Sequence, residues 1–217
     1  MKGKAVPGWS CAVAPCVFYI QAIALLCLLA LCVGCGRQPK IRKLSESSVV
    51  LAFGDSLTAG TGANGPESYP AVLSKMLGCR VINAGAPGED TTAGLSRLSG
   101  ALAQAKPQLV ILCHGGNDML RNEPQDITIS NLSAMIIMAK DAGADVILVG
   151  VPKPGLLLRA PPFYRNIAAK HNIPFNADAI AKILSTPALK CDQAHPNASG
   201  YRRLAESLAA LINEQQP

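Results

Sequence analysis

From about residue 48 to the C-terminus, short apolar runs alternate with longer segments in which apolar residues recur at helical spacing. The runs are rich in Val, Ile and Leu, and we predict strands at 48–53, 80–83, 109–113 and 145–149, with a short fifth strand near 173–175. Helices are predicted near 67–77, 91–105, 125–142, 163–171 and 197–214. Strand, helix and strand in this order need crossover connections, so the fold class should be α/β, with a parallel sheet covered on both faces.

The N-terminal part has a different pattern. No residue between Lys4 and Arg37 is charged, and residues 22–33 form an unbroken apolar stretch that is typical of a secretory signal. It ends in Leu31-Cys32-Val33-Gly34-Cys35, which resembles a bacterial lipobox and makes Cys35 the expected lipidation site, although Cys32 stands where Leu is usual. The alternatives are an uncleaved membrane anchor over 11–33 and a soluble secreted product. We therefore expect a leader over 1–35, a polar stalk over 36–48 and one domain over 49–217, anchored at the cell envelope.

Charge and cysteine content exclude other classes of protein. The net charge is +6, but the bases gather before residue 49, leaving 14 basic and 13 acidic residues after it, with no basic stripe for nucleic acid. Five of the eight cysteines lie in or at the end of the leader. Cys79, Cys113 and Cys191 remain, without the spacing of a disulfide framework or a zinc site, and we expect all three to be small buried side chains.

Polar and glycine-rich segments follow the predicted strands. They are Gly54-Asp55-Ser56-Leu57, Asn83-Ala84-Gly85-Ala86-Pro87-Gly88 and His114-Gly115-Gly116-Asn117-Asp118, and Asp192-Gln193-Ala194-His195-Pro196 precedes the last helix. Ligand sites of open parallel sheets lie at the carboxyl ends of the strands, so these segments should meet there.

Together these segments can activate a serine. A serine hydroxyl needs a base to take its proton and donors for the oxyanion that it creates. His195 can serve as base for Ser56, with Asp192 fixing its tautomer, while Asn117 and the backbone N–H of Gly88 can face the oxyanion. The alternative for Ser56 is an N-cap role.

Neighbouring polar residues have simpler interpretations. We expect Asp55 to brace the turn, Asp118 to initiate a loop and His114 to be partly buried and held by backbone groups. His171, at the end of a predicted helix, should be exposed.

The four segments resemble those of the SGNH, or GDSL, hydrolase family, in its arylesterase, thioesterase and lysophospholipase branch, over about residues 49–213. The resemblance implies a three-layer α/β/α, flavodoxin-like sheet of about five strands, with no metal or organic cofactor and a monomeric state. It makes Ser56 the nucleophile, Asp192 and His195 its partners, and Ser56, Gly88 and Asn117 the oxyanion donors. Pro87 replaces the usual serine of the second segment, which leaves Gly85 as a weaker candidate donor.

These observations favour a cell-envelope serine esterase that hydrolyses acyl esters or thioesters. The alternatives are a carbohydrate O-acetylesterase and a catalytically silent, lipid-anchored binding module. Apolar residues near the site favour acyl chains. We expect the pocket to include Met119, Leu120, Leu156, Leu157 and Phe163, although 156–158 has the alternative of starting a buried helix.

Overall fold

The computed structural model describes residues 3–4, 40–153, 155 and 157–217, and its folded unit starts at Pro39. Five parallel strands form a sheet in the order β2-β1-β3-β4-β5. This is the order of the flavodoxin-like fold. The strands are β1 (Val49–Gly54), β2 (Arg80–Gly85), β3 (Leu109–Cys113), β4 (Asp145–Val149) and β5 (Phe175–Asn176). The expected α/β fold with about five parallel strands is confirmed.

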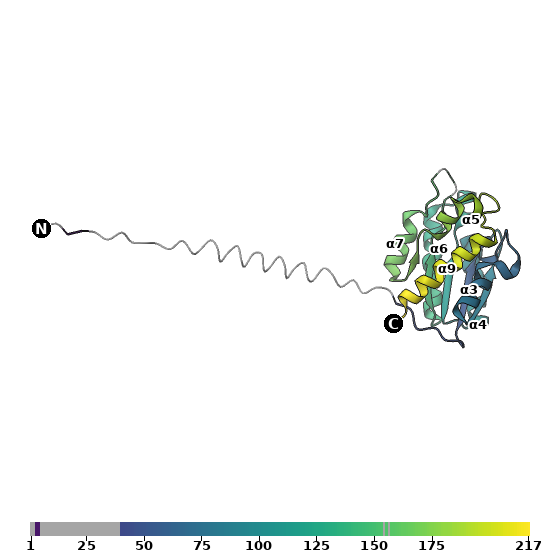
Figure 1. Cartoon of the computed structure of the whole chain (residues 1–217), viewed down its shortest axis with the longest axis horizontal. Coiled ribbons are helices and arrows are strands. Elements are labelled where there is room, and N and C mark those ends of the chain that lie inside the picture. The colour runs from purple at the N-terminus through teal and green to yellow at the C-terminus, as the bar shows by residue number, and fades with distance from the viewer. Residues whose placement is uncertain (1–2, 5–39, 154, 156) are drawn as a thin grey trace. The chain divides into compact units, whose positions relative to one another are not determined.

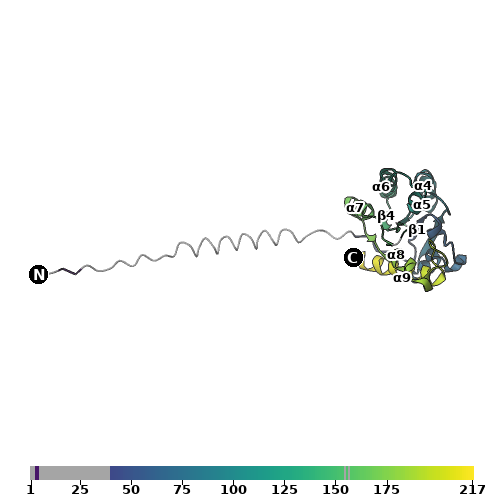
Figure 2. The ribbon, with the colours of Figure 1, turned by 90° about the horizontal axis from the view of Figure 1, so that it is seen from above.

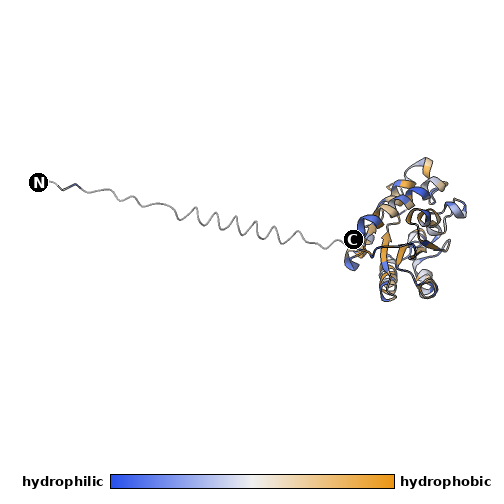
Figure 3. Cartoon of the chain, turned by 60° about the horizontal axis from the view of Figure 1, so that its bottom comes forward, coloured by the Kyte–Doolittle hydropathy of each residue, from blue (hydrophilic) through white to orange (hydrophobic). Residues whose placement is uncertain are grey.

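The strands form where apolar residues are continuous because the middle of this sheet is buried on both faces. All five residues of β3 are buried, and only the first residue of β1 is partly exposed. Colouring by hydropathy shows the strands as the apolar centre, with polar residues on the outer faces of the helices (Figure 3).

Helices cover the two faces of the sheet (Figures 1 and 2). On one side lie α4 (Thr91–Ala105), α6 (Gln125–Asp141) and α7 (Pro162–His171), which pack in that order. On the other side α9 (Ala198–Gln215) packs against α3 (Tyr69–Leu77) and α8 (Ala179–Leu184). The shorter elements are α2 (Ser56–Ala59), α5 (Gly116–Arg121) and the 3₁₀ turns η1 (Gly65–Glu67) and η2 (Pro187–Leu189).

Helix ends follow the local sequence. Asp90 caps α4 by accepting a hydrogen bond from the Ala93 N–H at 2.9 Å, and Asn197 caps α9 through the Gly200 N–H at 3.1 Å. Gly78 ends α3 in the left-handed conformation, with φ of 65°, which glycine adopts without strain. The predicted helices therefore end close to their expected boundaries, whereas α5 and α8 were not predicted.

The segment 41–48 is not the free polar stalk that the sequence suggested. Ile41 is buried at 3% exposure, and its N–H donates to the Gln215 carbonyl at 3.1 Å. Arg42 pairs with Asp145 at 3.0 Å. Ile41 and Leu44 pack against the core of the domain, although three of the eight residues of this segment are charged.

All of the leader except residues 3–4 lies outside the described residues, and so does Cys35. Of the helices that the structure describes, none combines the length and the apolar character needed to cross a membrane. Lipidation, cleavage and anchoring therefore stay predictions.

Candidate active site

Ser56 begins α2, directly after β1. Asp55, buried at 2% exposure, is the N-cap, and its carboxylate accepts from the Leu57 N–H at 3.0 Å. The bracing role expected for Asp55 is confirmed. Because Asp55 occupies the cap, Ser56 is free of that task, and its hydroxyl lines a cavity at the carboxyl end of the sheet.

His195 reaches Ser56 from the loop before α9. His195 Nε2 lies 3.0 Å from Ser56 Oγ, and His195 Nδ1 lies 2.8 Å from Asp192 Oδ2. With Nδ1–H donating to the carboxylate, Nε2 is left to accept the serine proton. The three residues thus form a connected line of hydrogen bonds.

The loop itself holds this histidine in place. Residues Lys190 and Pro196 form an antiparallel bridge, and the N–H groups of Ala194 and His195 both donate to Asp192 Oδ1, at 2.7 and 2.8 Å. Burial raises the pKa of Asp192, but the hydrogen bonds from His195 and from these backbone groups outweigh it and bring it to about 2. The orienting carboxylate is therefore ionised at any working pH.

Gly88 and Asn117 line the same cavity as Ser56, where they can face an oxyanion. Gly88 has φ of 78°, a left-handed conformation that favours glycine. Asn117, on α5, donates from Nδ2 to the Glu89 carbonyl at 2.9 Å, so its second amide hydrogen can serve a substrate oxygen.

Gly85, the weaker candidate donor, does not fit this role. Its N–H donates to Asn83 Oδ1 at 3.0 Å, and a Cβ added at Gly85 would stand 2.0 Å from the Ala59 nitrogen. Gly85 is therefore a close packing contact between β2 and α2.

The cavity beside Ser56 has a volume of about 290 Å³ and a mainly apolar lining. Besides the residues above, its walls include Leu57, Pro87, Leu120, Val151, Pro152, Leu158 and Leu184. Of the expected pocket residues, Leu120 lies in this lining, and Leu156 lies outside the described residues.

Three expected pocket residues lie elsewhere. Met119 and Phe163 line a separate pocket, and Leu157 is 73% exposed. The sequence indicated a loop at 119–120, but α5 is a helix, in which successive side chains point about 100° apart, so Met119 turns away from the cavity that Leu120 faces. Phe163 is buried and stacks on Tyr164. The described part of 156–158 forms no helix, contrary to the alternative interpretation.

Two polar side chains near the site are more buried than the sequence suggested and bind residues of other elements. Asp118 is a buried carboxylate that accepts from the Thr91 N–H and hydroxyl and so fixes the start of α4. His114 is fully buried and lies 3.1 Å from the Glu89 carboxylate. The partners of Asp118 and His114 lie on other elements, so the local sequence does not show them. The only local signal is that His114 directly follows an apolar strand.

Two further expectations about exposure were wrong. Cys191 is exposed in the histidine loop, whereas Cys79 and Cys113 are buried as expected. His171 is only partly exposed. In the part of the chain that the structure describes, no three metal-binding side chains come together.

The sequence matches the model of the GDSL-like lipase/acylhydrolase family over residues 52–203. The chain belongs to this family. That match spans more than half of the chain and contains all the site residues placed above, which makes this GDSL hydrolase an ester-hydrolysing serine hydrolase.

Curated relatives and a solved structure support the same family membership. Esterase TesA of Pseudomonas aeruginosa is 29% identical over 188 residues, covering 81% of this chain and 92% of that protein. Thioesterase 1/protease 1/lysophospholipase L1 of Escherichia coli K12 is 26% identical over 178 residues, covering 78% and 86%. The crystal structure of AlinE4, an SGNH-hydrolase family esterase, superposes with a TM-score of 0.61 at 32% identity, covering 81% of this chain and 100% of that one.

Proposed function

We propose that this GDSL hydrolase cleaves acyl esters or thioesters through an acyl-enzyme formed on Ser56. The observation that carries the proposal is the line from Ser56 Oγ to His195 Nε2, at 3.0 Å, and from His195 Nδ1 to Asp192, at 2.8 Å. Such a line at the wall of an apolar cavity supplies both a nucleophile and its base.

In the first half of the reaction, Ser56 Oγ attacks the acyl carbonyl carbon while its proton passes to His195 Nε2. The carbonyl oxygen becomes an oxyanion, which the Ser56 and Gly88 N–H groups and the Asn117 amide stabilise. When the oxyanion collapses, the bond to the alcohol or thiol breaks, and the leaving group takes the proton from His195. Asp192 stays ionised and steadies the imidazolium.

In the second half, water replaces the leaving group. His195 removes a proton from the water, whose oxygen attacks the acyl carbon, and the acid leaves as Ser56 Oγ regains a proton from His195. Every proton in this scheme moves through one histidine, and no step needs a metal.

Acyl chains suit the cavity better than sugars do. Its walls are formed largely by Leu, Val and Pro side chains, and no Trp, Tyr or Phe is among its lining residues within the described ranges. Sugar clefts are lined by polar and aromatic groups, so the O-acetylesterase alternative has less support. The name of the thioesterase and lysophospholipase relative also favours acyl substrates. A binding module without activity would need a broken triad, and this triad is connected.

A panel of p-nitrophenyl esters from acetate to palmitate, assayed beside an O-acetylated glycan, tests the substrate class. We expect kcat/KM to rise from acetate toward longer chains, because each methylene buried in the cavity adds about 0.8 kcal/mol. Turnover of the glycan together with only the acetyl ester would instead support the O-acetylesterase.

The cellular place of the enzyme is a second part of the proposal. The leader and Cys35 predict a lipoprotein of the cell envelope that faces the periplasm or the exterior. Two or more acyl chains on Cys35 would hold it at a membrane, where a single chain binds only marginally.

A further inference from the structure

Three side chains form a charged cluster beneath the loop that carries Gly88. The Arg97 guanidinium binds the Glu89 carboxylate through two nitrogens, at 2.6 and 2.8 Å. His114 Nε2 lies 3.1 Å from the same carboxylate. The His114 side chain is 0% exposed and that of Glu89 only 10%. None of the three lines the substrate cavity.

The protonation of the cluster follows from its hydrogen bonds. The Gly115 N–H donates to His114 Nδ1 at 3.2 Å, so the ring proton sits on Nε2 and is donated to Glu89. Burial raises the pKa of Glu89, but the hydrogen bonds from Arg97 and His114 and the positive charge of Arg97 outweigh it and hold that pKa below its ordinary value. Glu89 is thus a carboxylate, and its two oxygens are both occupied.

The cluster joins the ends of three strands. Arg97 also donates to the Ala84 carbonyl of β2 at 3.1 Å, and its guanidinium lies 4.2 Å above the Phe53 ring of β1. His114 directly follows β3. These strand ends lead into the segments that carry Ser56, Gly88 and Asn117.

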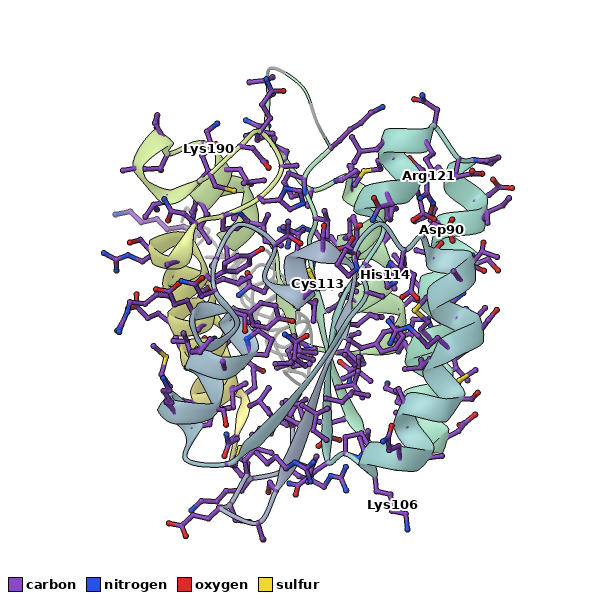
Figure 4. All side chains as sticks on the ribbon, turned by 90° about the vertical axis from the view of Figure 1, so that its right-hand side faces the viewer. Asp90, Lys106, Cys113, His114, Arg121 and Lys190 are labelled. Atoms are coloured by element: carbon purple, nitrogen blue, oxygen red, sulfur yellow. The ribbon has the colours of Figure 1, made fainter. Side chains whose placement is uncertain are left out.

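Glu89 links the cluster to two of the proposed oxyanion donors. It follows Gly88 in the chain, and its backbone carbonyl accepts the Asn117 amide at 2.9 Å. On the outer side, Arg121 donates to the Gly88 carbonyl at 2.7 Å and pairs with Asp90 at 2.6 Å. Figure 4 shows Asp90 and Arg121 together at the end of the molecule opposite to Lys106, with His114 between the sheet and α4. The Gly88–Glu89 segment is therefore held by α5 through its two carbonyls and by the cluster through the Glu89 side chain.

We propose that Arg97, Glu89 and His114 are positioning residues that set the geometry of the oxyanion hole, a role that rests on the proposed function. They act through the Glu89 backbone, which fixes where Gly88 N–H and Asn117 Nδ2 point. Donor placement matters most in the transition state, because a shift of about 1 Å at a catalytic group costs on the order of 10²-fold in rate. Loosening the cluster should lower kcat and leave KM nearly unchanged.

Two glycines of α4 offer a matched test that leaves the cluster residues in place. A Cβ at Gly94 would stand 2.5 Å from His114 Nε2, so Gly94→Ala must displace the ring that binds Glu89. In the described chain, a Cβ at Gly100 meets no heavy atom within 4 Å. Both changes remove a helical glycine, which by itself favours the helix by about 1 kcal/mol.

We expect Gly94→Ala to lower kcat for a p-nitrophenyl ester on the order of 10-fold at nearly constant KM, while Gly100→Ala keeps wild-type kinetics. Arg97→Lys provides a second variant, since a lysine cannot bind the carboxylate through two nitrogens, and it should show the same loss. Circular dichroism and the melting temperature establish that each variant is folded at the assay temperature. Wild-type kcat in both folded variants would overturn the proposal.

A double-mutant cycle with Asn117→Ala separates positioning from general damage. If the cluster acts through the oxyanion hole, Gly94→Ala and Arg97→Lys should lower kcat much less in the Asn117→Ala protein than in the wild type. If the double variants instead lost kcat by the full product of the two single-variant losses, this would overturn the positioning role while leaving the proposed function intact. An Asn117→Ala protein with wild-type kcat would instead contradict the proposed oxyanion hole, and the positioning role with it.

Discussion

His195 Nε2 and Ser56 Oγ lie 3.0 Å apart although 139 positions separate them in the chain. The contact exists because β1 and the loop before α9 end at the same edge of the sheet. It gives the serine a base, and it makes the activity depend on the protonation of a single ring.

The activity should rise with pH as His195 loses its proton, because only the neutral imidazole accepts the Ser56 proton. Asp192, with its pKa brought to about 2, stays charged above that pH and loses its orienting role only as the pH falls through that value. Asp192 should therefore add no step of its own to the acid limb of kcat/KM above about pH 2. Two overlapping titrations in a pH–rate profile would contradict this assignment.

Asp192→Asn should lower kcat on the order of 10²- to 10⁴-fold, because an amide can no longer accept from Nδ1–H as a carboxylate does and the imidazolium loses its counter-charge. Glu206→Gln, which removes the carboxylate of an exposed pair with Arg203, is the control and should leave kcat unchanged. The measurement is the steady-state kcat of both variants on the same ester. Equal activity in the two would remove Asp192 from the mechanism.

Asn117→Ala should lower kcat by about 10²- to 10³-fold with little change in KM, since its amide matters most once charge has developed on the oxygen. Gly88→Val should be at least as damaging, because a β-branched residue is strained at φ of 78°. A rise in KM alone for Asn117→Ala would make this residue a substrate binder.

The sequence predicted the strands and the long helices because each buries apolar side chains against the core, and this burial sets the spacing of apolar residues along the chain. It brought Ser56, Asp192 and His195 together because polar segments that follow parallel strands meet at one edge of the sheet, and the resemblance to a known family assigned the same three residues. It missed α5 and α8, since six residues are too few to show a helical period. It also missed the roles of Glu89 and Asp118, because their partners on other elements are set by the tertiary fold and by no local pattern.

Leu120→Ser should raise KM for octanoyl and longer esters and leave the acetyl ester unchanged, because Leu120 lines the cavity and its apolar contact is made only by a longer chain. Leu157→Ser is the matched control: this leucine is 73% exposed and lies outside the lining. Michaelis constants across the ester panel provide the readout. If both serine variants behaved alike, the cavity would not hold the acyl chain.

Cys35→Ser should block lipidation and leave the leader attached, whereas deletion of residues 1–38 should release an active hydrolase, because the folded unit begins at Pro39. The intact mass of detergent-extracted protein from the expressing cells distinguishes these states. A full-length, unmodified N-terminus would show that the apolar run is an uncleaved anchor.

The central claim is that Ser56 forms the covalent acyl-enzyme. The most direct measurement treats the protein with a p-nitrophenyl alkylphosphonate, which mimics the tetrahedral intermediate, and locates the adduct by intact mass and peptide mapping, beside the initial rate of Ser56→Ala on an ester. We predict one phosphonyl group per chain on Ser56, and a folded Ser56→Ala protein with kcat lower on the order of 10⁴-fold or more. An adduct on another residue, or substantial ester turnover by Ser56→Ala, would contradict the account.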